Sequence, residues 1–242
     1  MPTAREVLLN AAFVALGRRP WAGVRMVDVA AAAGVSRQTL YNEFGNKDGL
    51  ARALMRREAE AYLRGVERAL VAADDASDPG DRLAAAAVWT VRVARDNALV
   101  RAALTGCWDD WLPAPAAGPP ALPGQRPAPG SASVAAHREL RPATDAGRGP
   151  VVVDRPVDAA GPGASLPTPV ELVQTVSDRS LAALSDDWPP ESAADLARVC
   201  ETAARLAVSY VVAPGKPDEV AWLVREVLVP WRTAGQGEPS WR

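Results

Sequence analysis

The sequence predicts an all-α fold, and three features of its 242 residues indicate it. Thr3-Ala4-Arg5-Glu6 has the spacing of a capping box, in which the Thr hydroxyl and the Glu carboxylate satisfy free backbone N–H groups at a helix start. Apolar residues follow at helical spacing in Leu9, Phe13 and Leu16. Towards the other end, heptad-like spacing appears in Leu196, Val199, Ala203, Leu206 and Tyr210.

Two short helices joined by a tight turn are expected after the first helix. Gly17 to Gly23, with Pro20 among them, interrupt the first apolar pattern. Residues 26–33 then predict one short helix and residues 37–43 another, with Gly34 supplying a positive φ, Val35 an apolar contact and Ser36 a helix cap. This arrangement is a helix-turn-helix, which places its second helix in the major groove of DNA.

The charge distribution agrees with a polyanionic partner at this end of the chain. Residues 1–64 contain ten Arg and Lys against six Asp and Glu, whereas the remainder contains 17 against 23. The N-terminal excess of four positive charges is thus hidden within a net charge of -2 for the whole chain.

The residues of this motif resemble the TetR family of transcriptional regulators. The similarity lies in VDVAAAAGVSRQTLYNEFGNKDGL, residues 27–50, together with the preceding LLNAAFVAL and the turn containing Trp21, and it extends over about residues 5–60. The resemblance implies a DNA-binding helix-turn-helix followed by a helical region for ligand binding and dimerisation. It does not identify the ligand.

The second short helix carries the candidate base-contacting residues. The Ser36 backbone amide lies at a helix N-terminus, where it can donate to a phosphate. Arg37, Gln38 and Thr39 suit guanine, adenine and a thymine methyl group. The resemblance adds further contacts to phosphate or base. The complete candidate set is Arg25, Ser36, Arg37, Gln38, Thr39, Tyr41, Asn42 and Lys47. Leu40 and Phe44 are expected to face inward.

Three positions depart from the family pattern. Arg25 stands where a capping Thr or Ser is usual, and although it has no oxygen for capping, its side chain could reach a phosphate. Glu43 replaces a common His and is expected to weaken a phosphate contact. Pro20 stands where Gly is frequent. None of the three disrupts the apolar framework.

A long helix is expected from Lys47 to about Ala73, followed by helices over residues 78–96, with Asp78-Pro79 as cap and first turn, and 97–105. By resemblance, helices at these positions wall a ligand pocket, and ligand cavities are mostly apolar. Plain core packing is the alternative for each residue. The predicted pocket consists of Trp89, Val93, Leu104, Trp108, Trp111, Leu172 and Val176.

Residues 113–169 contain 13 Pro and seven Gly, a composition that predicts a disordered or irregular insertion. Two explanations fit this composition. The segment is either a tolerated surface insertion or a stretch whose reading frame does not correspond to that of related chains. The predicted organisation is a DNA-binding domain at 1–46, a helical effector-binding and dimerisation domain at 47–234 interrupted by this insertion, and a tail at 235–242.

Helical pattern resumes beyond the insertion. By resemblance, helices at about 170–188 and 192–212 form a four-helix bundle with a second copy, and intrachain packing is the alternative. A last amphipathic helix is marked by Val220, Leu223, Val224, Val227, Leu228 and Trp231.

Several function classes are not expected. The only histidine, His137, lies in Pro/Gly-rich sequence, and neither a phosphate-binding GxxxxGK[ST] nor a GxGxxG motif is present, so we expect no enzyme, cofactor or metal site. Cys107 and Cys200 form no CxxC pair. With no apolar run near ~20 residues and no readable leader, the expected location is the cytoplasm.

The sequence therefore predicts a homodimeric regulator that binds a near-palindromic double-stranded DNA operator. A repressor released by a small apolar effector is favoured, and activation stays open. The alternative is a ligand-binding helical protein or an enzyme with a non-functional helix-turn-helix.

Overall fold

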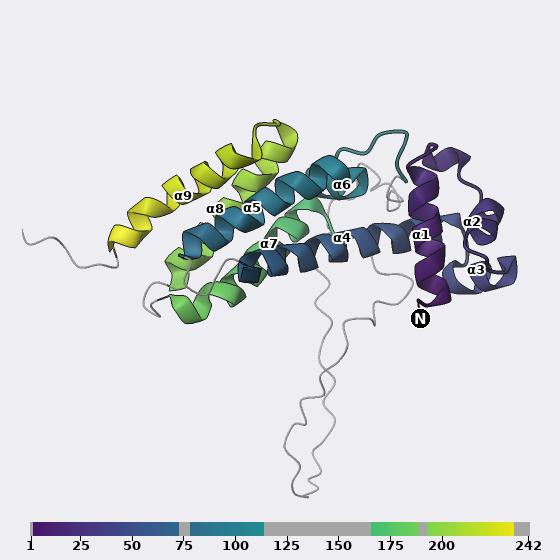
Figure 1. The fold of residues 1–242 in the computed structure, drawn as a ribbon, viewed down its shortest axis with the longest axis horizontal. Helices are drawn as coiled ribbons and strands as arrows, with labels where there is room; N and C mark the ends of the chain where they lie inside the picture. The colour runs from purple at the N-terminus through teal and green to yellow at the C-terminus, as the bar shows by residue number, and fades with distance from the viewer. Residues whose placement is uncertain (1, 73–77, 114–165, 189–192, 235–242) are drawn as a thin grey trace, which may run out of the picture. The chain divides into compact units, whose positions relative to one another are not determined.

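The computed structural model describes residues 2–72, 78–113, 166–188 and 193–234, and within these ranges all regular secondary structure is helical (Figure 1). This confirms the predicted all-α fold. The helices are α1 (Ala4–Leu16), η1 (Trp21–Gly23), α2 (Met26–Ala32), α3 (Arg37–Phe44), α4 (Lys47–Ala72), α5 (Pro79–Asp96), α6 (Ala98–Thr105), α7 (Pro169–Leu184), η2 (Ser185–Asp187), α8 (Ala193–Val212) and α9 (Pro217–Ala234). His137, the tail and nearly all of the Pro/Gly-rich segment predicted at 113–169 lie outside the described residues.

Side-chain caps begin the helices where the sequence predicts them. Thr3 and Glu6 form the expected capping box on α1. Asp78 caps α5 by accepting from the Gly80 N–H at 3.0 Å, with Pro79 as the first helical residue. Asn97 caps α6 in the same way, which explains why α5 and α6 are separate helices rather than one.

The inner face of α1 differs in one residue from the predicted stripe. Leu8, Leu9, Ala12 and Leu16 are buried, whereas Phe13 is 36% exposed. Phe13 therefore lies at the edge of the apolar face, where the guanidinium carbon of Arg57 stands 5.7 Å from the ring centroid.

Two apolar clusters hold the helices together. The N-terminal cluster joins α1, α2 and α3 to the first turns of α4, from Leu50 to Met55, and also contains Leu99, Ala102 and Leu112. The C-terminal cluster begins on α4 at Ala59 and joins the rest of that helix to α5, α6, α7, α8 and α9. The N-terminal core thus extends into α4, past the domain boundary predicted at residue 46.

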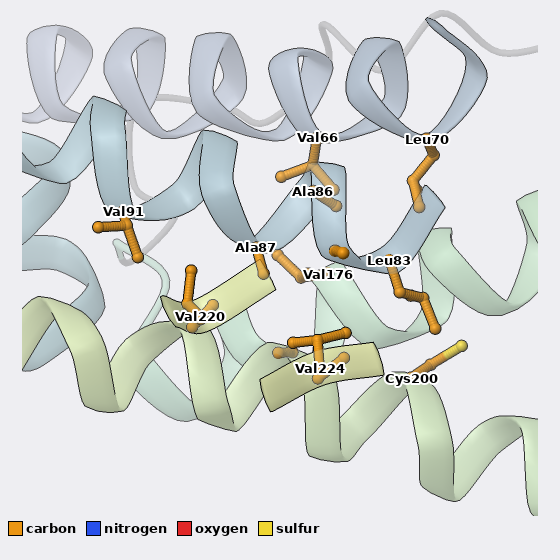
Figure 2. Packing of buried hydrophobic residues seen from close by; sticks show 14 of the residues in the cluster. Val66, Leu70, Leu83, Ala86, Ala87, Val91, Val176, Cys200, Val220 and Val224 are labelled. Atoms are coloured by element: carbon orange, nitrogen blue, oxygen red, sulfur yellow. The ribbon is translucent and has the colours of Figure 1, made fainter. Parts of the chain in front are cut away.

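Helix α5 lies at the centre of the C-terminal cluster. It packs against α4, α8 and α9, and its small residues allow close approach. In Figure 2, Val66 and Leu70 of α4 face Leu83 and Ala86 of α5, while Val224 of α9 approaches from the opposite side.

Helices α4 and α5 meet most closely at Gly65. A Cβ atom there would lie 2.1 Å from Cζ2 of Trp89. The same indole donates from Nε1 to the Tyr62 carbonyl at 3.2 Å, and the guanidinium carbon of Arg68 stands 5.9 Å from the ring centroid. Trp89 therefore lies in a slot that exists because residue 65 has no side chain.

Gly65→Ala is expected to lower the free energy of unfolding by about 1–3 kcal/mol, because the new methyl group overlaps a rigid ring. Urea unfolding measures the change. The second substitution in Gly65→Ala/Trp89→Leu removes the ring. The free energy of unfolding of the double variant should therefore fall by less than the sum of the decreases in the two single variants. Strict additivity would show that the slot does not constrain residue 65.

Tyr62 introduces a polar group into this core. Its hydroxyl lies 3.1 Å from the Thr90 Oγ1, which in turn donates to the Ala86 carbonyl at 2.9 Å. Burial raises the pKa of Tyr62 to about 12 from an ordinary 10.0, with the Thr90 hydrogen bond acting in the opposite direction. The folded chain thus holds this proton more tightly than the unfolded chain, a stability contribution present below pH 10 and lost as the pH rises towards 12.

The Tyr62→Phe variant should therefore respond less steeply to alkali than the unchanged protein. We expect the free energies of unfolding of the two proteins to converge as the pH rises from 9 to above 10. In the unchanged protein, ionisation of Tyr62 stabilises the unfolded state, whereas the variant has no hydroxyl to ionise. Urea unfolding at a series of pH values measures this, and parallel profiles would contradict it.

Candidate nucleic-acid interface

The turn before α3 forms as the sequence predicts. Gly34 has a φ of +65°, a region that a residue with a Cβ rarely adopts. Ser36 is extended and caps α3, its hydroxyl accepting from the Thr39 N–H at 3.0 Å and lying 2.8 Å from the Thr39 hydroxyl. The first turn of α3 is thus fixed by local hydrogen bonds.

The inner face of α3 is anchored in the N-terminal cluster. Leu40 is completely buried and Phe44 is 8% exposed, as expected. The guanidinium carbon of Arg5, on α1, stands 4.9 Å from the Phe44 ring centroid. Because α3 is short, these contacts rather than its own hydrogen bonds determine where its outer face points.

The outer face of α3 presents most of the predicted base-contacting residues. Arg37, Gln38, Tyr41 and Asn42 are exposed, and Gln38 donates from Nε2 to the Asn42 Oδ1 at 3.0 Å. That bond leaves Gln38 with one N–H and its carbonyl oxygen, the pair that adenine N7 and N6 require. Thr39 is half-buried, so only part of its side chain is accessible.

Arg25 and Lys47 border this face in different ways. Arg25 is exposed at the start of α2 and makes no side-chain capping bond. Lys47 is half-buried, donating from Nζ to the Ala22 carbonyl at 3.0 Å with the Trp21 ring centroid 5.5 Å away. Desolvation lowers the pKa of Lys47, and nearby Asp48 partly opposes the shift. Lys47 therefore braces η1 against α4.

An ion pair alters the expectation for Glu43. Its Oε2 lies 3.5 Å from Nη1 of Arg5, and the same nitrogen donates to the Glu43 carbonyl. Arg5 partly offsets the charge that was expected to repel phosphate, although the pair is exposed and weak. Arg5 was not among the predicted site residues, because 38 positions separate the partners and no local pattern connects them.

The structure does not bring the seven predicted pocket residues together. Leu104, Leu172 and Val176 are buried in the C-terminal cluster, with Trp89 and Val93 packed against it. Trp108 instead packs against the N-terminal cluster. An open groove of about 770 Å³ along α4 is lined by a different set, Ala61, Arg64, Glu67, Arg68, Val71 and Ala72.

Trp111 is separated from the other pocket residues because the chain turns away after α6. Gly106 ends α6 in the left-handed conformation. The Trp111 indole then donates to the Leu16 carbonyl at 2.9 Å, while its own carbonyl accepts from the Trp21 N–H at 2.8 Å. Trp111 thus ties the segment after α6 to the end of α1.

Two other kinds of site are not found in the described ranges. No group of three or more His, Cys, Asp or Glu side chains there is placed to hold a metal ion. None of the helices in those ranges is long and apolar enough to cross a membrane.

Known proteins share the N-terminal part of this chain. Residues 8–54 match the family described as bacterial regulatory proteins, tetR family. The HTH-type transcriptional regulator AlkX of Mycobacterium tuberculosis (strain ATCC 25618 / H37Rv) is 43% identical over 66 residues, 27% of this chain and 31% of AlkX. An uncharacterized HTH-type transcriptional regulator of the same strain, Rv1255c, is 33% identical over 102 residues, 42% of this chain and 49% of that protein. The alignments thus span less than half of either relative.

A solved structure extends the likeness to the helices that follow. The crystal structure of the TetR family repressor AlkX from Dietzia sp. strain DQ12-45-1b, implicated in biodegradation of n-alkanes, matches with a TM-score of 0.50. The match covers 96% of each chain at 21% identity. The arrangement of helices is therefore shared where the sequences have diverged.

Proposed function

We propose, from the match of residues 8–54 to the tetR family of bacterial regulatory proteins, that this protein is a sequence-specific DNA-binding transcriptional regulator. The observation that carries the proposal is the outer face of α3, where Arg37, Gln38 and Asn42 are exposed on a helix anchored from behind by Leu40 and Phe44. A short helix held this way offers donors and acceptors to base edges at a defined angle. We expect the protein to act in the cytoplasm and to bind bacterial double-stranded DNA.

The proposed form is a homodimer. Two α3 helices about one or more DNA turns apart, ~34 Å each, would contact a near-palindrome. The sequence alone placed the dimer contact at residues 170–188 and 192–212. We keep the contact on these two helices, α7 and α8, where Val170 is 74% and Val212 66% exposed.

Repression released by a small apolar effector is the proposed mode of action. The C-terminal cluster consists mainly of aliphatic side chains and alanines, which favours an apolar ligand between α4, α5, α7 and α8. Release requires the effector to bind better to a conformation with wrongly spaced α3 helices, and a complete switch needs ~10⁴-fold preference.

Selection of bound duplexes from a random pool tests the proposal. The full chain at low salt should enrich a near-palindromic site. Failure to enrich any sequence, with no shift of random DNA either, would contradict DNA binding and favour a ligand-binding protein whose helix-turn-helix is non-functional.

Gln38→Ala should reduce affinity for the selected site by ~1–3 kcal/mol and relax preference at one base pair in each half-site, because Gln38 contacts a base edge. Titration against the site and its single-base variants measures this. Gln174→Ala is the matched control, since Gln174 is also an exposed glutamine bonded to the side chain four residues on, but on α7. Equal losses on selected and random DNA would contradict the assignment of Gln38.

Lys47→Ala should weaken binding to all sequences similarly and lower the salt slope by about one, as expected for loss of one phosphate contact. Because Lys47 also bonds Ala22, Lys47→Gln separates the effects by keeping an N–H donor without the charge. Lys216→Ala, a lysine remote in sequence from the helix-turn-helix, should leave the slope unchanged. An unchanged slope in Lys47→Gln would show that residue 47 acts only as a brace.

A further inference from the structure

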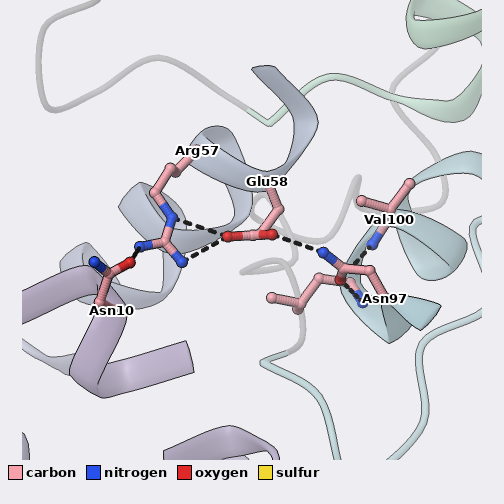
Figure 3. A network of polar contacts seen from close by, with 6 residues as sticks. Asn10, Arg57, Glu58, Asn97 and Val100 are labelled. Atoms are coloured by element: carbon pink, nitrogen blue, oxygen red, sulfur yellow. Dashed lines mark hydrogen bonds and ion pairs between the residues drawn. The ribbon is translucent and has the colours of Figure 1, made fainter. Parts of the chain in front are cut away.

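Glu58 lies on α4 at the junction between the two apolar clusters. Met55, one turn before it, belongs to the N-terminal cluster, and Ala59, directly after it, belongs to the C-terminal cluster. Glu58 is only 9% exposed. A carboxylate so nearly buried requires charged or hydrogen-bonding partners, and Figure 3 shows two of them, Arg57 of α4 and Asn97 between α5 and α6.

Each carboxylate oxygen of Glu58 has its own partner. Oε1 accepts from Nε and Nη2 of Arg57, at 2.8 and 2.6 Å. Oε2 accepts from Nδ2 of Asn97 at 2.6 Å. The two oxygens therefore connect α4 with the residue that separates α5 from α6 (Figure 3).

The orientation of the Asn97 amide is fixed by its role as a cap. Its Oδ1 accepts from the N–H groups of Leu99 and Val100, at 3.0 and 3.3 Å. Only the Nδ2 side of Asn97 is then available for Glu58. Asn97 consequently requires an acceptor at residue 58 as long as α6 is capped.

Arg57 carries the connection to α1. Its Nη1 donates to Oδ1 of Asn10 at 2.7 Å, and its guanidinium carbon stands 5.7 Å from the Phe13 ring centroid. Asn10 and Phe13 lie one turn apart on α1. The carboxylate of Glu58 thus holds Arg57 against α1 and Asn97 against α4 at once.

We propose that Glu58 is a positioning residue for DNA binding, setting the orientation of α1, and with it α3, relative to α4 and the α5–α6 junction. The inference rests on the proposed function. Helix α1 transmits the position because Arg5 on the same helix contacts Phe44 and Glu43 at the end of α3. Trp111 supplies a second attachment, to the Leu16 carbonyl. In a dimer, a rotation of α1 relative to α4 changes the distance between the two α3 helices, so the half-site spacing reports the position that Glu58 sets.

Exchanging the carboxylate and the amide tests this connection. Glu58→Gln leaves one acceptor for Arg57 and Asn97 together, so one N–H group loses its partner. Asn97→Asp keeps an oxygen that caps α6 but places a second carboxylate against Glu58. In Glu58→Gln/Asn97→Asp, the oxygen of the introduced glutamine can accept from Arg57 and its amide can donate to the introduced aspartate, so complementarity is restored with the groups exchanged.

The readout is discrimination between spacers. The unchanged protein should bind its selected site better than versions with one base pair added to or removed from the centre. In each single variant, the ratio of the affinity for the selected site to the affinity for the altered spacers should fall about tenfold, the scale of one charge-assisted hydrogen bond. The double variant should regain it, and preference within each half-site should persist in all three. Glu60→Gln is the matched control, because Glu60 is an exposed glutamate paired with Arg64 on α4.

The outcomes separate this inference from the proposed function. If the unchanged protein enriches no DNA, the proposed function fails. If the unchanged protein discriminates spacers and the folded single variants discriminate equally well, Glu58 does not set the position. Uniform loss on every spacer, in step with lower thermal stability, also overturns the inference, since that is what a purely structural role predicts. Recovery in the double variant supports it even if one single variant fails to fold.

Discussion

Helix α4 is buried in two different apolar clusters along its length, and this constraint underlies the rest of the structure. Leu50 and Leu54 are completely buried in the N-terminal cluster, and Val66 and Leu70 are completely buried in the C-terminal cluster. Because both ends of α4 are packed, α4 cannot shift relative to the helices of one cluster without disturbing its packing in the other cluster. Packed interiors leave little free volume for such a shift. The α3 face is therefore presented from a framework that includes the whole of α4.

One set of hydrogen-bonded polar groups, around Glu58, lies between the two apolar clusters. Between the clusters, Glu58 satisfies Arg57 and Asn97, and a buried carboxylate without those partners would be strongly destabilising. Hydrogen bonds are directional, so the contacts of Glu58 constrain angles as well as distances. The junction is thus well suited to define an angle, while the clusters on either side provide stability.

Helix α6 shows how closely the two parts are joined. Leu99 and Ala102 lie in the N-terminal cluster, and Val100 and Leu104 lie in the C-terminal cluster. One end of α6 is held through Asn97 and the other, beyond Gly106, through Trp111. An effector that displaced α6 would act on contacts to α1 as well as to α4, which gives the proposed release from DNA a physical path.

The local sequence was sufficient to predict helix starts, the turn at Gly34 to Ser36, and the inward-facing Leu40 and Phe44, because caps, positive φ and helical periodicity depend on residues within one or two turns of each other. Only the tertiary structure decided which distant groups meet. Arg5 pairs with Glu43, and Arg57 bonds Asn10. Trp111, which was predicted for the pocket, instead donates to the Leu16 carbonyl. These contacts depend on how helices cross, and no spacing along the chain encodes that. The sequence therefore determined the elements and the exposed face of α3, whereas packing alone decided how that face is held.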